Sequence, residues 1–243
     1  MSSALERGLG ILELMVTHPA GLPVSRIAAL LDMPVSGVHR QLKELARLGY
    51  VRQAREQGDY LLSVKLSALG LSFLGRSGVT DIAQPILDRL AATSAELIRL
   101  SVIDGDQLVW VAVAQGATGG LRYDPGREQG VVVHLASTAG GQAWLASMND
   151  EDALALVNRY MIGMAAMAVP VRYGTGGAVV GCLSIAGPSV RLDRERVTAL
   201  APILNEAAAE LSAAADASHF FSRLGRETSG TPGLTGTRTA RSG

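Results

Sequence analysis

The chain has 243 residues, of which 48% are hydrophobic and 18% are charged, and its 22 Lys and Arg balance 22 Asp and Glu. This length suffices for one small domain and a second core of moderate size. The single cysteine, Cys182, excludes an internal disulfide and a cysteine zinc cluster. Without a signal-like start or an apolar run of about 18 residues, the sequence predicts a cytoplasmic protein that does not enter a membrane.

The balanced charge hides an asymmetry between the two ends of the chain. Residues 1–76 carry 9 Lys and Arg against 6 Asp and Glu, whereas the remainder carries 13 against 16. The net charges are therefore +3 and −3. This distribution favours a nucleic-acid partner for the front of the chain only.

Residues 24–60 show the element order of a winged helix-turn-helix. Helical spacing over 24–31, a turn at Asp32-Met33-Pro34 and a second helical pattern over 36–48 lead into a hairpin of 50–53 with 60–62. The hairpin would be the wing. In such a unit the second helix enters the major groove of DNA, and its first residues contact the base edges.

The second helix separates an apolar stripe from a basic face. Val38, Leu42 and Leu45 recur at i, i+4 and i+7, so the polar side chains lie opposite them. A basic face of this kind is also common on helices whose polar side is simply solvated, and that alternative stays open. The residues expected to contact DNA are Arg7, Ser25, Ser36, Gly37, His39, Arg40, Lys43, Arg47, Arg52 and Arg55.

Beyond this unit, helical patterns over 66–76 and 79–94 carry apolar stripes that predict either a dimer contact or packing within the chain. From residue 96 the period changes to two, which predicts strands. We expect strands over 98–102, 108–113, 121–123, 131–135, 167–171 and 178–185, and helices over 138–147, 151–159 and 193–215. The fold class would be α+β. A tail over 222–243 has a composition typical of disorder.

Several separated motifs resemble the IclR family of bacterial transcriptional regulators. The run Ile27-Ala28-Ala29-Leu30-Leu31-Asp32-Met33-Pro34-Val35-Ser36-Gly37-Val38-His39-Arg40-Gln41-Leu42 resembles its DNA-binding domain. The segments 6–14, 66–70, 135–145 and 183–188 resemble its first helix, its linker helix and its effector-domain motifs. The resemblance covers about residues 4–217 and implies four parts: a winged helix-turn-helix (1–64), a linker helix (65–78), a GAF-like effector-binding domain (79–221) and a tail (222–243).

This resemblance also implies partners. It implies double-stranded DNA with an imperfect inverted-repeat operator, a small organic acid as effector, and a homodimer or a dimer of dimers. No cofactor and no metal is expected. The other hypothesis is an enzyme or a ligand sensor whose front domain mediates assembly only.

The segment Leu135 to Leu145 passes from a strand through small residues into a helix. A helix N-terminus offers backbone N–H groups and a partial positive charge to an anion. From the residues alone, Ser137 or Thr138 could instead be only an N-cap. The family resemblance favours a pocket, and the residues expected to line it are Leu121, Ser137, Thr138, Ala139, Gly140, Met164, Ala166, Ser184 and Ala186.

The chain departs from the family pattern in this region. Ala136, Gln142, Ala166 and Ala186 stand where the family often has histidine, lysine, cysteine and serine. We therefore expect a less polar, roomier pocket that accepts a small aromatic or branched acid and binds pyruvate poorly. Near Tyr160-Met161 the family has a few dozen more residues, which are either deleted in this chain or omitted from the sequence as printed.

Residues for catalysis are sparse. The four histidines, His18, His39, His134 and His219, are scattered and form no pattern typical of metal ligands or a general base. Cys182 lies in an apolar strand, where a core role is expected. Trp110 is expected in the core, with a pocket wall as its alternative role.

Overall fold

The computed structural model describes residues 3–54, 58–104, 107–116, 130–134, 137–148, 155–157, 163–173, 177–215 and 217–229. The chain divides into two compact units, Met1–Leu74 and Gly75–Gly243. Within the described ranges, no helix is long and apolar enough to cross a membrane.

The first unit is a winged helix-turn-helix, as the sequence predicted. Its helices are α1 (Ala4–Val16), α2 (Val24–Leu30) and α3 (Val35–Arg47), followed by the hairpin of β1 (Val51–Gln53) and β2 (Tyr60–Leu62). The wing is antiparallel, with Val51 opposite Leu62. Helix α4 (Val64–Ser77) follows and leads into the second unit.

Local sequence explains why these elements begin and turn where they do. Ser3 and Glu6 form a reciprocal capping box at the start of α1. Asp32 adopts a left-handed conformation with φ of 49° between α2 and α3, a conformation that Asp tolerates better than most residues. The predicted stripe of α3 is buried together with Ile11 and Ile27, which fixes the orientation of the polar face.

The second unit is built on one six-stranded sheet with the order β5-β4-β3-β8-β7-β6. All neighbouring strands are antiparallel. The strands are β3 (Leu97–Asp104), β4 (Gln107–Gln115), β5 (Val132–His134), β6 (Ala155–Val157), β7 (Met164–Arg172) and β8 (Val179–Pro188). Together with its helices this sheet confirms the α+β class.

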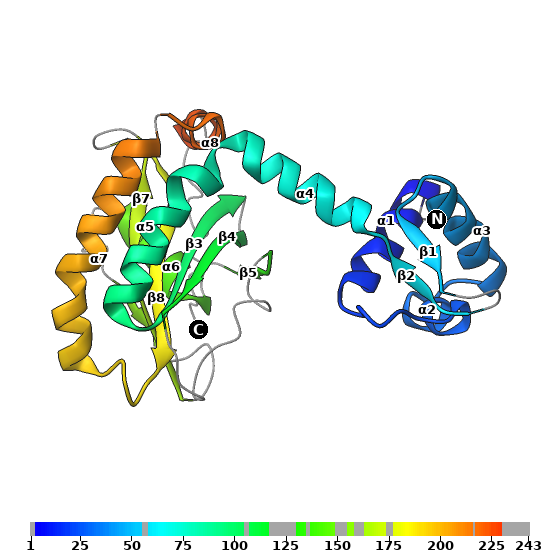
Figure 1. The fold of residues 1–243 in the computed structure, drawn as a ribbon, viewed down its shortest axis with the longest axis horizontal. Helices are drawn as coiled ribbons and strands as arrows, with labels where there is room; N and C mark the ends of the chain where they lie inside the picture. The colour runs from blue at the N-terminus through cyan, green and yellow to red at the C-terminus, as the bar shows by residue number, and fades with distance from the viewer. Residues whose placement is uncertain are drawn as a thin grey trace, which may run out of the picture. The chain divides into compact units, whose positions relative to one another are not determined.

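Helices cover both faces of this sheet (Figure 1). Helices α5 (Val79–Ser94) and α7 (Arg194–Ala215) lie together on one face, and α6 (Ala139–Met148) lies on the other. The larger core includes Leu87, Leu183 and Leu204. A smaller core includes Leu108, Ala143 and Cys182, and it lies between the sheet and α6.

Two glycines allow close approach in this smaller layer. A Cβ on Gly181 would lie 2.2 Å from the Ser101 carbonyl oxygen, so β8 can pair with β3 there only through glycine. A Cβ on Gly140 would lie 3.2 Å from a Leu108 methyl and 3.4 Å from the Cys182 Cβ. The absence of a side chain at Gly140 therefore brings the first turn of α6 close to the sheet.

The helix predicted over 151–159 is wrong in its centre, because Ala155–Val157 forms strand β6 and pairs with β7. A short apolar run does not distinguish helix from strand by its period, and the unpaired edge of β7 decides the outcome here. Residues 151–154 and 158–162, and the strand predicted over 121–123, lie outside the described residues.

The tail prediction is also wrong at its start. Helix α8 spans His219–Ser229, so regular structure continues past residue 221. Phe221 is fully buried, and Phe220 and Leu224 are each 8% exposed. The tail was predicted from the Gly, Ser, Thr and Arg composition after Phe221, but Leu224 within it packs in the larger core.

Candidate functional sites

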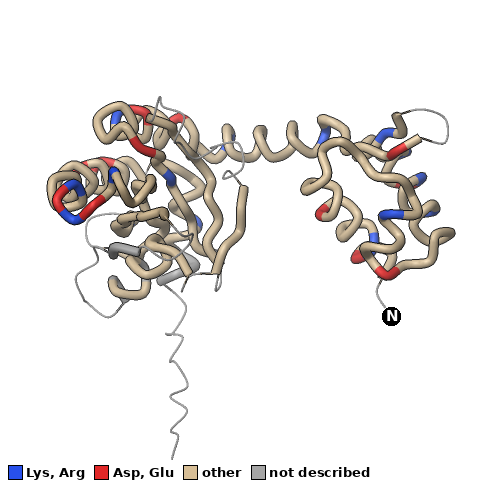
Figure 2. Tube along the Cα trace, turned by 90° about the horizontal axis from the view of Figure 1, so that it is seen from below, with Lys and Arg blue, Asp and Glu red and all other residues tan. Residues whose placement is uncertain are grey.

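The polar face of α3 is exposed, and most of the residues expected to contact DNA surround it. Figure 2 shows that basic positions occur through the whole first unit. The side chains of Ser36, His39, Arg40 and Lys43 on α3 are exposed, as are Ser25 on α2 and Arg52 on β1. Arg7 on α1 and Gly37 on α3 are half-buried, and Arg55 lies outside the described residues.

The two ends of α3 are stabilised differently. Its N-cap is Pro34, which makes no side-chain hydrogen bond to the first turn. At the other end, the Lys65 ammonium donates to the Leu48 carbonyl at 2.7 Å and lies 4.6 Å from the centre of the Tyr50 ring. A cation near the carbonyl end of a helix is favourable. No local pattern indicates this role of Lys65, because its partner lies 17 residues away.

Arg47 differs from the other basic residues of α3 because it is paired. Its guanidinium donates to both carboxylate oxygens of Glu44, one turn earlier, with Nε 3.0 Å from Oε2. This hydrogen bond lowers the pKa of Glu44 and raises the pKa of Arg47. Both groups are charged at neutral pH, and a phosphate would have to compete with Glu44 for Arg47.

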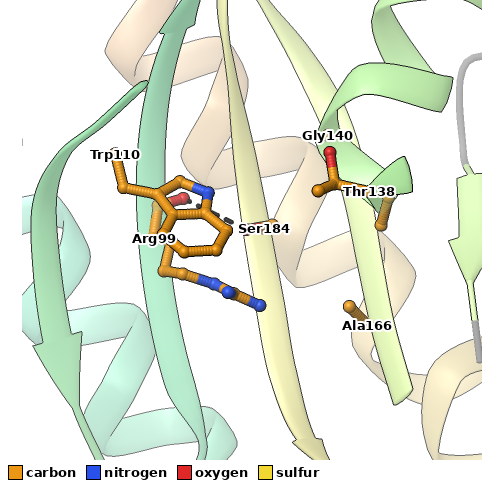
Figure 3. A pocket seen from close by; sticks show the side chains of 7 residues that line it. Arg99, Trp110, Thr138, Gly140, Ala166 and Ser184 are labelled. Carbon is orange, nitrogen blue, oxygen red and sulfur yellow. Dashed lines mark hydrogen bonds between the residues drawn. The ribbon is translucent and has the colours of Figure 1, made fainter. Parts of the chain in front are cut away.

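A small cavity lies where the first turn of α6 meets the sheet (Figure 3). It has a volume of about 20 Å³ and is lined by Arg99, Trp110, Thr138, Ala139, Gly140, Ala166 and Ser184. Five of these seven were expected from the sequence: Thr138, Ala139, Gly140, Ala166 and Ser184. The volume is room for about one water molecule, so the cavity is much smaller than expected.

The junction combines the two roles that the sequence left open. The Thr138 hydroxyl accepts a hydrogen bond from the Gly141 N–H at 3.1 Å and thereby caps α6, while Thr138 also lines the cavity. Ser137 is exposed and its hydroxyl donates to the His134 carbonyl at 2.7 Å. Thr138 is the cap that contributes to the cavity wall, and Ser137 is not among the lining residues.

Three other expected residues are not among those that line the cavity. Met164 and Ala186 lie two residues beyond Ala166 and Ser184, toward the ends of β7 and β8. Leu121 lies outside the described residues. The role of Met164, Ala186 and Leu121 in effector binding stays a prediction.

Arg99 and Trp110 complete the cavity, and they change its chemistry. Arg99 is only 7% exposed, and its guanidinium carbon lies 4.4 Å from the centre of the Trp110 ring. The backbone carbonyl of Arg99 accepts a hydrogen bond from the Ser184 hydroxyl at 3.4 Å. The wall therefore contains a cation on an aromatic face, whereas the sequence predicted a pocket that is mostly apolar.

The alternation of residues along β3 could have indicated that Arg99 faces the cavity. Ile98, Leu100 and Val102 are buried in the larger core, so a residue between them faces the layer on the other side of the sheet. An arginine at that position points toward α6. Trp110 was expected in the core, with a pocket wall as the alternative, and it does both: it is 4% exposed in the smaller core and also lines the cavity.

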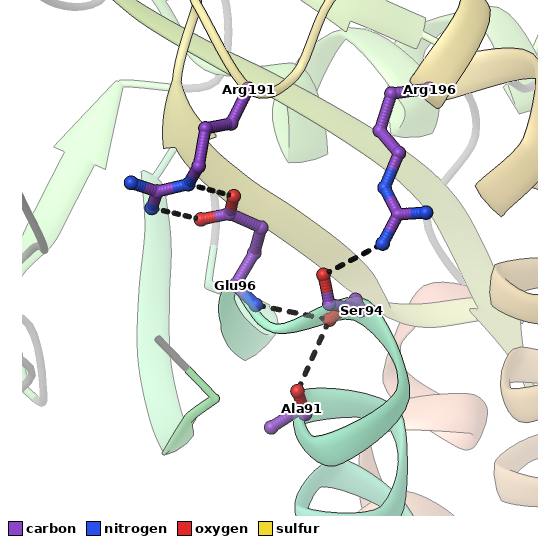
Figure 4. Close-up of polar contacts among 5 residues, drawn as sticks. All are labelled: Ala91, Ser94, Glu96, Arg191 and Arg196. Carbon is purple, nitrogen blue, oxygen red and sulfur yellow. Dashed lines mark hydrogen bonds and ion pairs between the residues drawn. The ribbon is translucent and has the colours of Figure 1, made fainter. Parts of the chain in front are cut away.

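An ion pair connects the start of β3 to the end of β8 (Figure 4). Arg191 Nε and Nη2 donate to the two carboxylate oxygens of Glu96 at 2.7 and 2.8 Å. The Glu96 side chain is 5% exposed and that of Arg191 is 37% exposed. The hydrogen bond raises the pKa of Arg191. Arg196 adds a hydrogen bond to the Ser94 carbonyl at 3.2 Å.

Residues with catalytic or metal-binding chemistry do not gather in the described ranges. No group of three His, Cys, Asp or Glu there could hold a metal ion. Cys182 is fully buried and its thiol donates to the Gly140 carbonyl at 3.0 Å. Cys182 thus packs as a small core residue, as expected.

Comparison with known proteins agrees with this architecture. Residues 4–55 match the model of the IclR helix-turn-helix domain. The HTH-type transcriptional regulator BhcR of Paracoccus denitrificans is 29% identical, over 86% of each chain. An HTH-type transcriptional regulator of Haemophilus influenzae is 30% identical, but that match spans only 50% of this chain and 45% of the relative.

Solved structures are similar over nearly the whole chain. An IclR homologue of Microbacterium hydrocarbonoxydans, solved in complex with 4-hydroxybenzoate, has a TM-score of 0.70 at 19% identity. The match covers 89% of this chain and 100% of that one.

The described structure thus consists of a winged helix-turn-helix followed by an α+β domain with a cavity beside a helix N-terminus. The chain therefore carries an IclR helix-turn-helix domain and is similar to an HTH-type transcriptional regulator over 86% of its length.

Proposed function

We propose that this chain binds an imperfect inverted repeat of double-stranded DNA as a dimer, and that a small aromatic acid in the cavity alters this binding. The cavity carries the effector part of the proposal, because five residues expected on independent grounds meet there. The structurally similar Microbacterium protein binds 4-hydroxybenzoate, which supports an acid of this class.

The DNA-binding part of the proposal is supported by the exposed face of α3. Arg40 lies on this face, near the start of the helix, and no described side chain pairs with it in an ion pair. An arginine placed there can bind guanine through two hydrogen bonds. The wing would place Arg52 near a phosphate.

The dimer part of the proposal is supported by the surface of α4. Leu69, Leu71 and Phe73 are 50%, 69% and 51% exposed. Apolar side chains gathered on one helix with this exposure mark an interaction surface. Leu69 and Phe73 are four residues apart and share one face of α4, whereas Leu71 lies on the other side. A second copy of α4 would bury the face with Leu69 and Phe73, and two copies of α3 would then read the two arms of one operator.

The effector would change the DNA affinity because it binds two conformations of the chain with different affinities. An acid that binds one conformation of the effector domain more tightly shifts the population toward that conformation. Helix α4 ends at Ser77, the left-handed Gly78 turns the chain into α5, and α5 packs in the core that contains β3, so only this one turn separates the linker helix from that core. DNA and effector then alter each other's affinity by the same factor.

The proposal is tested by selecting DNA fragments with the full chain and mapping the protected repeat. Addition of 4-hydroxybenzoate should change the affinity for the selected repeat, whereas pyruvate should have a smaller effect because it leaves apolar surface unfilled. Absence of any selected sequence would contradict the DNA-binding part. Equal affinity with and without aromatic acids would contradict the effector part.

Two variants separate base recognition from phosphate contact. Arg40→Ala should weaken binding to the repeat by about 1 to 3 kcal/mol and affect unrelated DNA much less. Lys43→Ala, the matched control on the same face, should weaken both and reduce the salt slope by about 1. Equal losses for both DNAs in Arg40→Ala would exclude a base contact.

A further inference from the structure

We propose that Arg99 is the residue that binds the acid group of the effector and thereby makes the cavity selective for anions. The inference rests on the effector function proposed above. It replaces the acid anchor that the sequence suggested, the α6 N-terminus with Ser184, by a side chain from the middle of β3.

The positive charge of Arg99 lies in the wall of the cavity. Arg99 lies opposite Ser184 in the β3–β8 register, and its side chain extends beside the Trp110 ring into the space below the first turn of α6 (Figure 3). Arg99 is 7% exposed and lines the cavity, so its positive charge lies in the cavity wall and not in solvent. An anionic ligand in the cavity would meet this charge at short range.

The Arg99 guanidinium complements a carboxylate in shape and in charge. The guanidinium donates from a planar fork that fits the two oxygens of a carboxylate. The first turn of α6, which carries a partial positive charge, forms another part of the wall. A carboxylate between the two would be held by both, whereas a neutral amide of the same shape would gain little from either.

The cavity is too small for an aromatic acid unless a side chain in its wall moves. A cavity of about 20 Å³ cannot hold an aromatic ring, since a benzene-sized guest needs roughly 150 Å³. Among the seven lining residues, Arg99 has the only long flexible side chain. If the guanidinium leaves the Trp110 face to meet the carboxylate, the ring of the ligand can take its place on the indole. Arg99 thus binds the acid and opens the cavity in one movement.

The test compares an acid with its neutral analogue, using calorimetry on the full chain. Benzoate should bind the wild type about 10- to 100-fold more tightly than benzamide, which is the range for hydrogen bonds to charged groups. Arg99→Gln should remove this preference by weakening benzoate, while benzamide affinity changes less than about 3-fold. Arg99→Lys should retain part of it, because lysine keeps the charge without the fork.

The matched control is Arg89→Gln. Arg89 lies on α5 of the same unit and pairs with Glu210, and its side chain is 59% exposed. This variant should leave the benzoate preference unchanged. Thermal unfolding of all three variants establishes that they are folded, and the wild-type comparison of acid and amide requires no substitution.

The outcomes separate this inference from the function on which it rests. Benzoate binding that keeps its advantage over benzamide in Arg99→Gln would overturn the role of Arg99 and leave the effector function intact. An equal affinity of the wild type for benzoate and benzamide would also overturn it. If neither 4-hydroxybenzoate nor benzoate binds the wild type, both proposals fail.

Discussion

Single side chains in this protein act through the partners that surround them, and the Glu96–Arg191 pair illustrates this. Both hydrogen bonds of the pair are short, but only the carboxylate is deeply buried. A Cβ on Gly187 would lie 2.4 Å from a Glu96 oxygen, so β8 also packs tightly against this carboxylate. Removal of Arg191 is therefore expected to destabilise the fold more than removal of Glu96.

This asymmetry predicts unequal losses of stability. Arg191→Ala would leave a buried carboxylate without its cation and should lower the free energy of unfolding by about 3 to 5 kcal/mol. Glu96→Ala would leave an arginine that can reach water and should cost less, about 1 to 3 kcal/mol. Urea denaturation measures both values. A larger loss for Glu96→Ala would contradict the assigned burial of the pair.

A second prediction at this scale concerns the Glu44–Arg47 pair on α3. Glu44→Gln should release Arg47 and remove a negative charge near the DNA, so affinity for all DNA rises and the salt slope steepens by about 1. Binding measured by fluorescence anisotropy at several salt concentrations reports this slope. Glu13→Gln, an exposed carboxylate on α1, is the control and should leave the slope unchanged.

At the scale of elements, α8 is a helix that the polar composition of the tail did not predict. The Ser218 hydroxyl, just before α8, donates to the Ser77 carbonyl at the end of α4 at 2.7 Å. Gly78, whose φ is 75°, turns the chain from α4 into α5 at this contact. The last helix thus packs against the point where the linker enters the second unit.

We expect α8 to contribute to the stability of the second unit. Phe221→Ala should lower its free energy of unfolding by about 3 to 5 kcal/mol, the usual cost of emptying a buried aromatic site. The control is Val190→Ala, since Val190 is 78% exposed and should change stability by less than about 0.5 kcal/mol. Equal melting temperatures for the Phe221 variant and the wild type would mean that α8 does not belong to the core.

Some helices and strands could be predicted from the sequence alone and others could not. Periodicity predicted α3, α5, α7 and most strands, because each of these buries a regular apolar stripe. It failed at β6, where pairing with β7 determines the structure. For the cavity, the family motifs indicated Gly140 and Ser184, but Arg99 comes from a strand some 40 residues earlier. Contacts between distant strands are not encoded in any local pattern.

At the scale of the whole molecule, the proposed dimer predicts the spacing of the operator. Two α3 helices would lie about one turn of DNA apart, roughly 34 Å. Insertion of half a turn between the arms of the repeat should abolish tight binding, because the second reader would face the opposite side of the duplex. Insertion of a full turn is the control and should be less harmful.

The oligomeric state is measured on the same preparation. Analytical ultracentrifugation at micromolar concentration should find a dimer or a tetramer, and Leu69→Glu on α4 should shift it toward the monomer. A wild-type monomer that protects a single half-site would exclude the paired arrangement.

The sheet order has a consequence for synthesis of the chain on the ribosome. The core of the first unit is closed by Tyr60, so this unit can fold once it emerges, while the second unit is still being synthesised. The second unit cannot, because β3 lies between β4 and β8 and its core needs Leu204 and Phe221. The winged helix-turn-helix is therefore folded before the α+β domain, and premature termination after β5 would release the first unit without the strands β7 and β8 that the proposed effector site needs.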